Sequence, residues 1–277
     1  MPSLYVVATP IGNLEDISLR ALRVLGEVGL IAAEDTRRTR RLLDRYGLRT
    51  PLTSYHEHNR RAKLPQVLGH LAGQDVALVS EAGMPGISDP GYELVAACIE
   101  RDIPVVPVPG ASAVITALAI SGLPTRQFTY LGFLPRRRGE RRRLLEPLAL
   151  QTRTLIVLES PHRLLGALDD LIGALGDRRV AVCRELTKLH EEVFRGTLPE
   201  AREHFTEPRG EFTLVIEGHT GGPEAPSPPQ GGGLKKELRH LRGQGLSAKE
   251  AVAQAARTTG TSKREAYREW LRLIKDS

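Results

Sequence analysis

The amino-acid sequence predicts an α/β protein with two α/β domains and a small helical domain at the C-terminus. Two observations predict this architecture. Short apolar runs alternate with helix-periodic segments as far as about residue 218, and a basic helix-periodic segment follows a stretch rich in glycine and proline. The length of 277 residues is enough for two or three domains, and a composition with 40% hydrophobic and 26% charged residues is typical of a soluble protein.

Residues 1–122 form the first expected domain, which consists of five strand–turn–helix units. Each strand run is short and apolar, and each is followed by a turn and a helix-periodic segment. Repetition of this unit predicts a parallel sheet with helices on both faces. Ligands of such sheets bind beyond the carboxyl ends of the strands, where this chain places residues 10–13, 34–37, 80–91 and 109–113.

The turn at residues 80–91 (SEAGMPGISDPG) is the most distinctive of these segments. Its glycines permit positive φ angles and a close approach of the backbone to a ligand, and its two prolines stiffen the path between them. It lacks the glycine spacing of a dinucleotide-binding fingerprint, and the chain contains no P-loop motif. We therefore expect a ligand loop of another kind, with an ordinary glycine and proline turn as the alternative.

Residues 123–218 form the second expected α/β domain. Five strand runs are expected near residues 128–133, 154–158, 179–183, 193–196 and 212–216. Because fewer helices separate these strands, the sequence predicts a mixed sheet rather than a purely parallel one.

The C-terminal part of the chain carries the whole excess of positive charge. Residues 219–233 contain five glycines and four prolines and are expected to form a linker. Residues 234–277 contain 11 basic and five acidic residues, whereas the preceding residues contain equal numbers of each. Capping boxes beginning at Ser247 and Ser262 predict two short helices, so a basic helix-turn-helix domain that binds a polyanion is expected.

Neither a membrane protein nor a metalloprotein is expected. No run approaches the ~18 apolar residues needed to cross a bilayer, and the N-terminus enters a strand without the features of a signal peptide. We therefore expect a cytoplasmic protein. His56 and His58 flank a glutamate, but no third ligand stands at a suitable spacing, and a polar loop is favoured over a metal site.

Six segments, in order and at similar spacing, resemble the tetrapyrrole methylase superfamily, and within it the enzymes that methylate small-subunit ribosomal RNA. They are residues 9–14 (TPIGNL), 34–37 (EDTR), 80–91, 108–113 (VPGASA), 159–163 (ESPHR) and 184–188 (RELTK). One departure is Met84, where relatives usually have threonine, so that position lacks a hydroxyl to bond a ligand.

The resemblance implies an S-adenosylmethionine-dependent enzyme that methylates the ribose 2′-hydroxyl of a cytidine in the decoding region of 16S ribosomal RNA. It also implies a homodimer that acts on this RNA or on the small ribosomal subunit, with the cofactor in a cleft between two α/β domains. Carried over residue by residue, the expected cofactor contacts are Pro10, Ala82, Gly83, Met84, Ile87, Ser112, Ala113, Glu159 and Leu186.

Methyl transfer to a ribose hydroxyl requires a group that accepts the hydroxyl proton, because the hydroxyl is a poor nucleophile at pH 7. Four candidates lie on turns at the expected ligand edges: Asp35 and Lys188, which rank first, and Asp89 and Glu159. Structural roles are the alternatives. Asp35 can cap the helix that follows it, and Asp89 can brace its loop through an Asx turn.

Arginines and lysines near the expected cleft and in the tail are candidates for RNA contacts. Arg37 and Arg163 can bind phosphates, or instead pair with neighbouring carboxylates. A charge run is often a solvated face, but six arginines beside one acid favour phosphate contacts. The run comprises Arg136, Arg137, Arg138, Arg141, Arg142 and Arg143, and the tail adds Lys235 and Lys236. Two other functions stay open: methylation of a small molecule or protein side chain, and RNA binding without catalysis.

Overall fold

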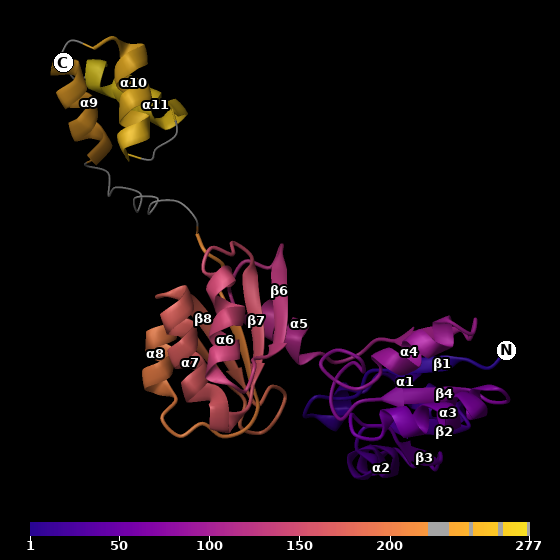
Figure 1. The fold of residues 1–277 in the computed structure, drawn as a ribbon. Helices are drawn as coiled ribbons and strands as arrows, with labels where there is room; N and C mark the ends of the chain where they lie inside the picture. Colours follow the sequence, from indigo (N-terminus) through magenta and orange to yellow (C-terminus); the bar gives the residue numbers. More distant parts are fainter. Residues whose placement is uncertain (221–232, 244–245, 260–262, 276–277) are drawn as a thin grey trace. The chain divides into compact units, whose positions relative to one another are not determined.

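The computed structural model describes residues 1–220, 233–243, 246–259 and 263–275. The chain divides into two compact units, Met1–His219 and Thr220–Ser277. The first unit holds two five-stranded sheets, and the described residues of the second form three helices (Figure 1). Residues 221–232 of the predicted linker lie outside the described residues.

The first sheet is entirely parallel, as the repeated strand–turn–helix units predict. Its strands run in the order β3-β2-β4-β1-β5, so β1 and β4 are neighbours at the centre. The bounds are β1 Leu4–Val7, β2 Leu30–Ala33, β3 Leu52–Ser54, β4 Val76–Val79 and β5 Val105–Val108. All residues of β2 and β4 are buried, which explains why their sequences are continuously apolar rather than alternating.

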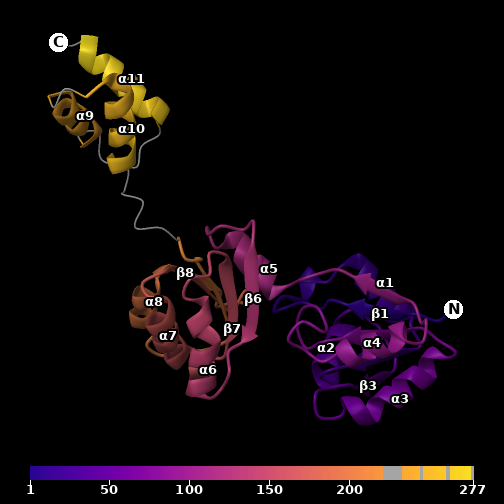
Figure 2. The same ribbon diagram turned by 45° about the horizontal axis from the view of Figure 1, so that its top comes forward.

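Helices cover both faces of this sheet (Figure 2). Two helices, α1 (Leu19–Glu27) and α2 (Thr36–Arg45), pack against one face, and their buried residues include Leu25 and Leu43. The helices α3 (Arg60–Leu71) and α4 (Tyr92–Ile99) pack against the other.

The centre of the sheet positions the glycine-rich turn. Beyond the ends of β1 and β4, Thr9 and Gly83 form an isolated antiparallel bridge. The Thr9 amide donates to the Gly83 carbonyl at 2.9 Å, and the Gly83 amide donates to the Thr9 carbonyl at 3.0 Å. The turn at residues 80–91 is therefore fixed to the chain that leaves β1.

The second sheet is mixed, as predicted. Its order is β6-β7-β10-β8-β9, and only β6 and β7 run parallel. The bounds are β6 Phe128–Phe133, β7 Thr154–Glu159, β8 Arg179–Arg184, β9 Glu192–Thr197 and β10 Phe212–Ile216. Three helices enclose a core on one face: α6 Arg138–Leu145, α7 Pro161–Leu175 and α8 Leu198–His204.

The other face of the second sheet is covered by α5 (Ala113–Ile120), which follows β5 of the first sheet. Val114, Ala117 and Leu118 of α5 pack in one cluster with Ile156 of β7 and Val215 of β10. Sequence analysis assigned this helix to residues 1–122. Because α5 is apolar at nearly every position, its periodicity gives no buried face by which its packing partner could be recognised.

The C-terminal unit contains α9 (Gly233–Gly243), α10 (Ala248–Thr259) and α11 (Lys263–Lys275) around a core that includes Leu238, Ala255 and Trp270. The predicted capping box at Ser247 is present, with the Ser247 hydroxyl and the Glu250 carboxylate each accepting from the other residue's amide. Ser262 lies outside the described residues, as do the side chains of Lys235 and Lys236. None of the described helices is long and apolar enough to cross a membrane.

Candidate active site

A cavity of about 410 Å³ lies where the carboxyl end of the first sheet meets the second sheet. Its walls come from the loops after β1, β2, β4 and β5, and from strands of the second sheet. Nine of the residues that the sequence indicated for the cofactor or for catalysis line it: Ala82, Gly83, Met84, Ile87, Asp89, Ser112, Ala113, Glu159 and Leu186. Pro10 lines a second, adjoining cavity instead.

The glycine-rich turn forms one wall through an unusual backbone path. Gly83 has φ 82° and Gly86 has φ 83°, values that residues with a Cβ atom rarely adopt. Ser88 nevertheless has φ 63°, and its hydroxyl lies 2.7 Å from the Tyr130 hydroxyl of β6. A strained residue is retained when surrounding contacts fix it, and such residues cluster at functional sites. This strained position directly precedes Asp89.

Asp89 lines the cavity and has a strongly raised pKa. Burial and the negative charges of Glu34 and Glu81 raise the pKa of Asp89 to about 7, although the Ser80 hydroxyl acts in the opposite direction. A carboxyl group with a pKa near 7 is a stronger base than an ordinary aspartate and is still partly ionised at neutral pH. Its position and pKa suit a proton acceptor.

Glu159 presents a buried carboxylate oxygen at the opposite wall. The residue is 1% exposed, and Oε1 accepts a hydrogen bond from the Ser160 amide at 2.8 Å. Oε2 lies 3.2 Å from Nη2 of Arg163, but among the described residues it has no partner with hydrogen-bond geometry. Burial raises the pKa of Glu159, against the influence of Ser160 and Arg163. A buried oxygen without a hydrogen bond is suited to accept one from a ligand.

Comparison with known proteins identifies the family. The family model for Tetrapyrrole (Corrin/Porphyrin) Methylases matches residues 3–202. The chain belongs to the tetrapyrrole methylase family. It is similar to proteins named Ribosomal RNA small subunit methyltransferase I from Synechocystis, with 50% identity over all of both chains, and from Halalkalibacterium halodurans, with 48% identity over 96% of this chain and 93% of the relative.

Solved structures agree on the fold. Uroporphyrin-III C-methyltransferase from Thermus thermophilus, complexed with S-adenyl homocysteine, has a TM-score of 0.56 at 21% identity and covers 78% of this chain and 97% of that one. A diphthine synthase has a TM-score of 0.59 at 13% identity, with 77% and 89% covered. This tetrapyrrole methylase is therefore a methyltransferase with the family's two-domain architecture.

The turn after β8 is also strained where it meets the cavity of this methylase. Glu185 and Thr187 have φ angles of 49° and 67°, and Leu186 between them lines the cavity. The turn packs closely on the chain after β1, because a Cβ atom on Gly12 would lie 2.5 Å from Cγ of Lys188. Thr187 also accepts a hydrogen bond from the Asn13 amide at 3.0 Å.

Lys188 secures this turn rather than acting as a base. Its Nζ donates to carboxylates of Glu185 and Glu211, both at 2.9 Å. Burial alone would lower the pKa of Lys188, but the two carboxylates outweigh burial and raise it. The ammonium is therefore protonated at neutral pH. A lysine is a useful proton acceptor at neutral pH only when its pKa is lowered, whereas Glu185 and Glu211 raise the pKa of Lys188.

Asp35 takes the alternative role of a helix cap. Its Oδ1 accepts hydrogen bonds from the amides of Arg37 and Arg38, at 2.8 and 3.1 Å. These bonds lower the pKa of Asp35 below its usual value, which makes it a weak base. Asp35 is not among the residues that line either cavity. The structure thus favours Asp89 over both first-ranked candidates.

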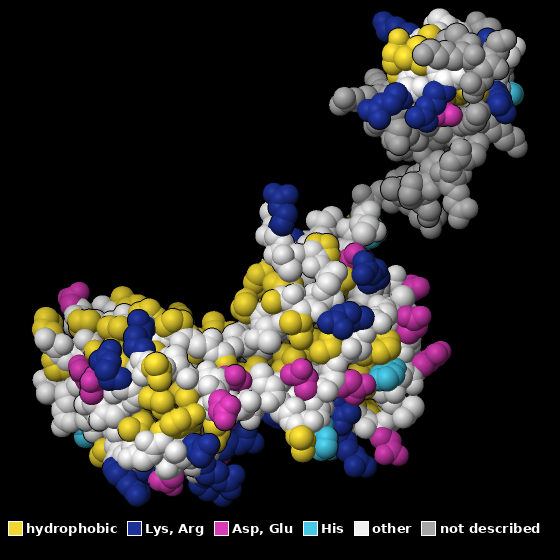
Figure 3. Space-filling view, turned by 180° about the vertical axis from the view of Figure 1, so that it is seen from behind, with side chains coloured by type: hydrophobic (Ala, Val, Ile, Leu, Met, Phe, Trp, Pro, Cys, Tyr) yellow, Lys and Arg dark blue, Asp and Glu magenta, His cyan; other side chains and the backbone are white. Residues whose placement is uncertain are grey.

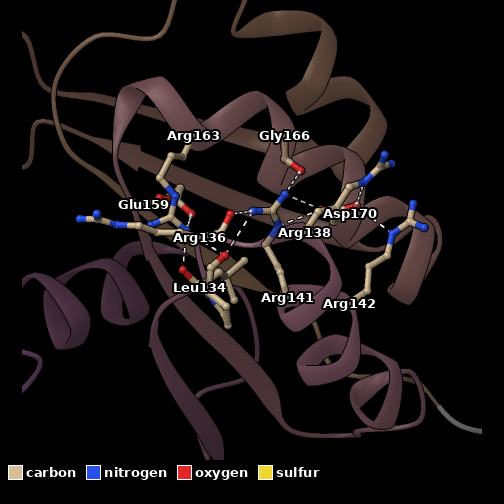
Figure 4. Close-up of polar contacts among 10 residues, drawn as sticks. Leu134, Arg136, Arg138, Arg141, Arg142, Glu159, Arg163, Gly166 and Asp170 are labelled. Carbon is tan, nitrogen blue, oxygen red and sulfur yellow. Dashed lines mark hydrogen bonds and ion pairs between the residues drawn. The ribbon is translucent and has the colours of Figure 1, made fainter.

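Much of the arginine run at residues 136–143 is engaged in the protein's own contacts (Figure 4). Arg141 is 8% exposed, and its guanidinium binds the buried Asp170 and the carbonyls of residues 135, 136 and 166. Arg138 and Arg142 each donate to Oδ1 of Asp170 at 3.1 Å. The prediction that Arg141 contacts RNA is therefore wrong, because its guanidinium is buried.

Arg163 is likewise committed to the fold. Its guanidinium donates to the carbonyl groups of Leu134 and Pro135 and forms the ion pair with Glu159 (Figure 4). It ties the chain after β6 to the end of β7, and pairing with a carboxylate was the alternative that the sequence left open. Beyond the three arginines that bind Asp170, the exposed arginines of the run are Arg136, Arg143 and Arg137, which pairs with Glu140 at 3.4 Å.

Sequence analysis missed several lining residues as site residues, and Glu34, Tyr130 and Thr213 are among them. Glu34 was detectable, since it stands directly after a buried strand in a segment that the sequence placed at the ligand edge. Tyr130 and Thr213 lie inside β6 and β10. A strand pattern shows only that alternate residues share a face, so it cannot show which face of the second sheet lines a cavity.

Proposed function

We propose that this methylase transfers a methyl group from S-adenosylmethionine to the ribose 2′-hydroxyl of a cytidine in the decoding region of 16S ribosomal RNA. The proposal depends most on the position of Asp89 in the cavity wall. A carboxyl group there with a pKa of about 7 is suited to accept a hydroxyl proton. The names of the relatives, Ribosomal RNA small subunit methyltransferase I, support the RNA substrate.

The cavity residues fit the cofactor in size and in chemistry. A volume of about 410 Å³ is in the range of small-molecule sites. The backbone of the glycine-rich turn and of residues 112–113 offers hydrogen-bonding groups, and Oε2 of Glu159 can accept from a hydroxyl or amine of the nucleoside. Glu34, Glu81 and Asp89 place negative charge on the wall opposite, which favours a sulfonium cation.

When bound, S-adenosylmethionine supplies an electrophilic methyl group. The residues of the chain supply positioning and a proton acceptor. The strained turns at Ser88 and Leu186 fix the cavity walls before ligands enter, so that less ordering is needed at the moment of reaction. As the new oxygen–carbon bond forms, the Asp89 carboxylate takes the proton that the ribose hydroxyl releases.

We further propose that the protein acts as a cytoplasmic homodimer on the small ribosomal subunit or its RNA. The basic C-terminal unit supports an RNA partner, because residues 234–277 carry 11 basic and five acidic residues. A small acceptor gives no physical reason for such a unit. Modification of a small molecule on the same scaffold is the second candidate, since that is the named activity of some structural neighbours.

A partition experiment tests the proposal. The protein is incubated with methyl-labelled S-adenosylmethionine and, in separate reactions, with small ribosomal subunits from cells that lack the activity or with uroporphyrinogen. Label is expected in the RNA of the wild-type reaction. Asp89→Asn should lower the turnover by roughly 10²-fold and cofactor affinity by far less, because Glu34 and Glu81 still place negative charge on that wall. Label in the tetrapyrrole alone would support methylation of a small molecule. Label in neither acceptor would indicate a protein that binds RNA without catalysis.

A further inference from the structure

A strongly basic helix borders the site of this methylase. Five of the ten residues of α2 are arginines and one is an aspartate. Thr39, Leu42 and Leu43 face the core, so the arginines are directed away from it. In Figure 3, Lys and Arg side chains gather at the lower edge of the first α/β half, where Figure 1 places α2.

Three of these arginines, Arg37, Arg41 and Arg45, are exposed and have no ion pair among the residues that the structure describes. Among the residues that the structure describes, neither Arg37 nor Arg41 forms an ion pair or a side-chain hydrogen bond. Asp35, whose pKa is lowered in part by the charge of Arg37, is occupied in capping the helix. Since residues four apart lie on one side of a helix, Arg37 and Arg41 form a row about 6 Å long. The Arg38 side chain pairs with Glu81.

Three arginines of α6 differ from those of α2 in having a buried partner. The run at residues 136–143 has more arginines, but three of them converge on the single buried carboxylate of Asp170 (Figure 4). Their charge is used inside the protein. The charge of Arg37 and Arg41 has no such counterpart, and exposed unpaired guanidinium groups are those best placed to bind phosphates.

A second cavity connects this helix with the cofactor cavity. It has a volume of about 320 Å³ and is lined by Arg38 and Arg41 of α2. Ile11, Glu81 and Ala82 line both cavities, so the two adjoin along a common wall. A chain lying along α2 and over the second cavity would therefore pass beside the cavity in which the methyl group is donated.

We propose that the exposed row Arg37–Arg41 of α2 and the mouth of the second cavity bind the phosphodiester backbone next to the nucleotide that is methylated. The proposal rests on the proposed function and adds the surface along which the RNA approaches. A nucleotide can reach a cavity only when it is single-stranded or extruded from a duplex, so the bound strand is single-stranded at this point. The positive charge of Arg37 and Arg41 favours a polyanion. Because the two cavities share a wall, the strand bound there is the one that contains the methylated nucleotide.

The test compares two double variants with equal loss of charge. Arg37→Gln with Arg41→Gln removes the row, and Arg61→Gln with Arg126→Gln removes two exposed arginines elsewhere. Binding of the full-length proteins to a labelled single-stranded RNA oligonucleotide and to small ribosomal subunits is measured over a series of salt concentrations. Each phosphate contact in a single strand contributes about 0.7 to the slope of log affinity against log salt.

Loss of the row should lower RNA affinity by about tenfold or more and flatten the slope by about 1.4 relative to the control pair. Cofactor affinity, measured by calorimetry, should be the same in both variants, which also shows that each is folded. Arg37→Lys with Arg41→Lys should restore most of the slope. Equal RNA affinity and slope in the two glutamine variants would overturn the proposal. The proposed function fails separately, if wild-type protein binds RNA without methylating it.

Discussion

Replacing Asp170 by Asn should strongly destabilise the first unit of the protein. Asp170 is 1% exposed and accepts hydrogen bonds from Arg138, Arg141 and Arg142. Asn keeps the size of the side chain but removes the charge, and Arg141 is then a buried cation without a counterion. Breaking a buried pair in this way costs about 3–5 kcal/mol. For a unit of this size, each kcal/mol lowers Tm by about 2–4 °C, so a decrease of roughly 6–20 °C is expected.

The neighbouring Asp169 offers a matched control. Its side chain is 52% exposed and forms an ion pair with Arg202 at 2.8 Å. Exposed pairs contribute between about 0 and 1 kcal/mol, so Asp169→Asn should change Tm by a few degrees at most. Thermal and urea unfolding of both variants measure the difference. A change below about 1 kcal/mol for Asp170→Asn would refute the argument that the arginine run is held by a buried carboxylate.

The pH dependence gives a second check on the same network. Burial would raise the pKa of Asp170, but the three arginines outweigh it and hold the pKa below its usual value. The folded state therefore favours the ionised form. The stabilisation is fully present above the unfolded pKa and is lost as pH falls through the folded pKa. The stability difference between wild type and Asp170→Asn should shrink in that acidic range and be constant near neutrality.

Three further predictions concern the site and the tail. Because Asp89 has a raised pKa, kcat/KM should increase with pH through about 7. Glu34→Gln removes a negative charge that raises this pKa, so it should move the midpoint of the profile to lower pH. An unchanged profile in Glu34→Gln would contradict the role of Asp89 as the proton acceptor. Gly83→Val, at φ 82°, should abolish cofactor binding in calorimetry, whereas Gly47→Val, at φ 70° with no atom near its Cβ, should not. Deleting residues 220–277 should weaken RNA binding and its salt dependence and leave cofactor binding intact; unchanged RNA affinity would exclude the tail as an RNA contact.

The two sheets could be predicted from the sequence because their strands carry strong local signals. The continuously apolar runs that became β2 and β4 indicated strands buried on both faces, and the glycine and proline turns indicated where the parallel strands end. The packing of α5 could not be predicted. A helix without a polar face gives no sign of its partner, and the partner here is a sheet that comes later in the chain.

The cavity residues were easier to predict than the chemistry of individual groups. Glycine-rich turns at strand ends gave the cavity walls, since the topology brings those ends together. The state of each ionisable group depends on neighbours distant in sequence. Lys188 is held by Glu211, and Arg141 by Asp170, and neither pairing is visible in the spacing of the chain. Asp35 is the exception, because its capping role is local and was predicted as an alternative.

The position of the methyl group on the RNA tests the central claim most directly. Small ribosomal subunits from cells that lack the activity are methylated with labelled S-adenosylmethionine, and the 16S RNA is then hydrolysed in alkali. A methylated 2′-oxygen cannot attack the neighbouring phosphate, so ribose methylation at one cytidine predicts that all label remains in a single dinucleotide. Label recovered in mononucleotides would place the methyl group on a base and would contradict the account.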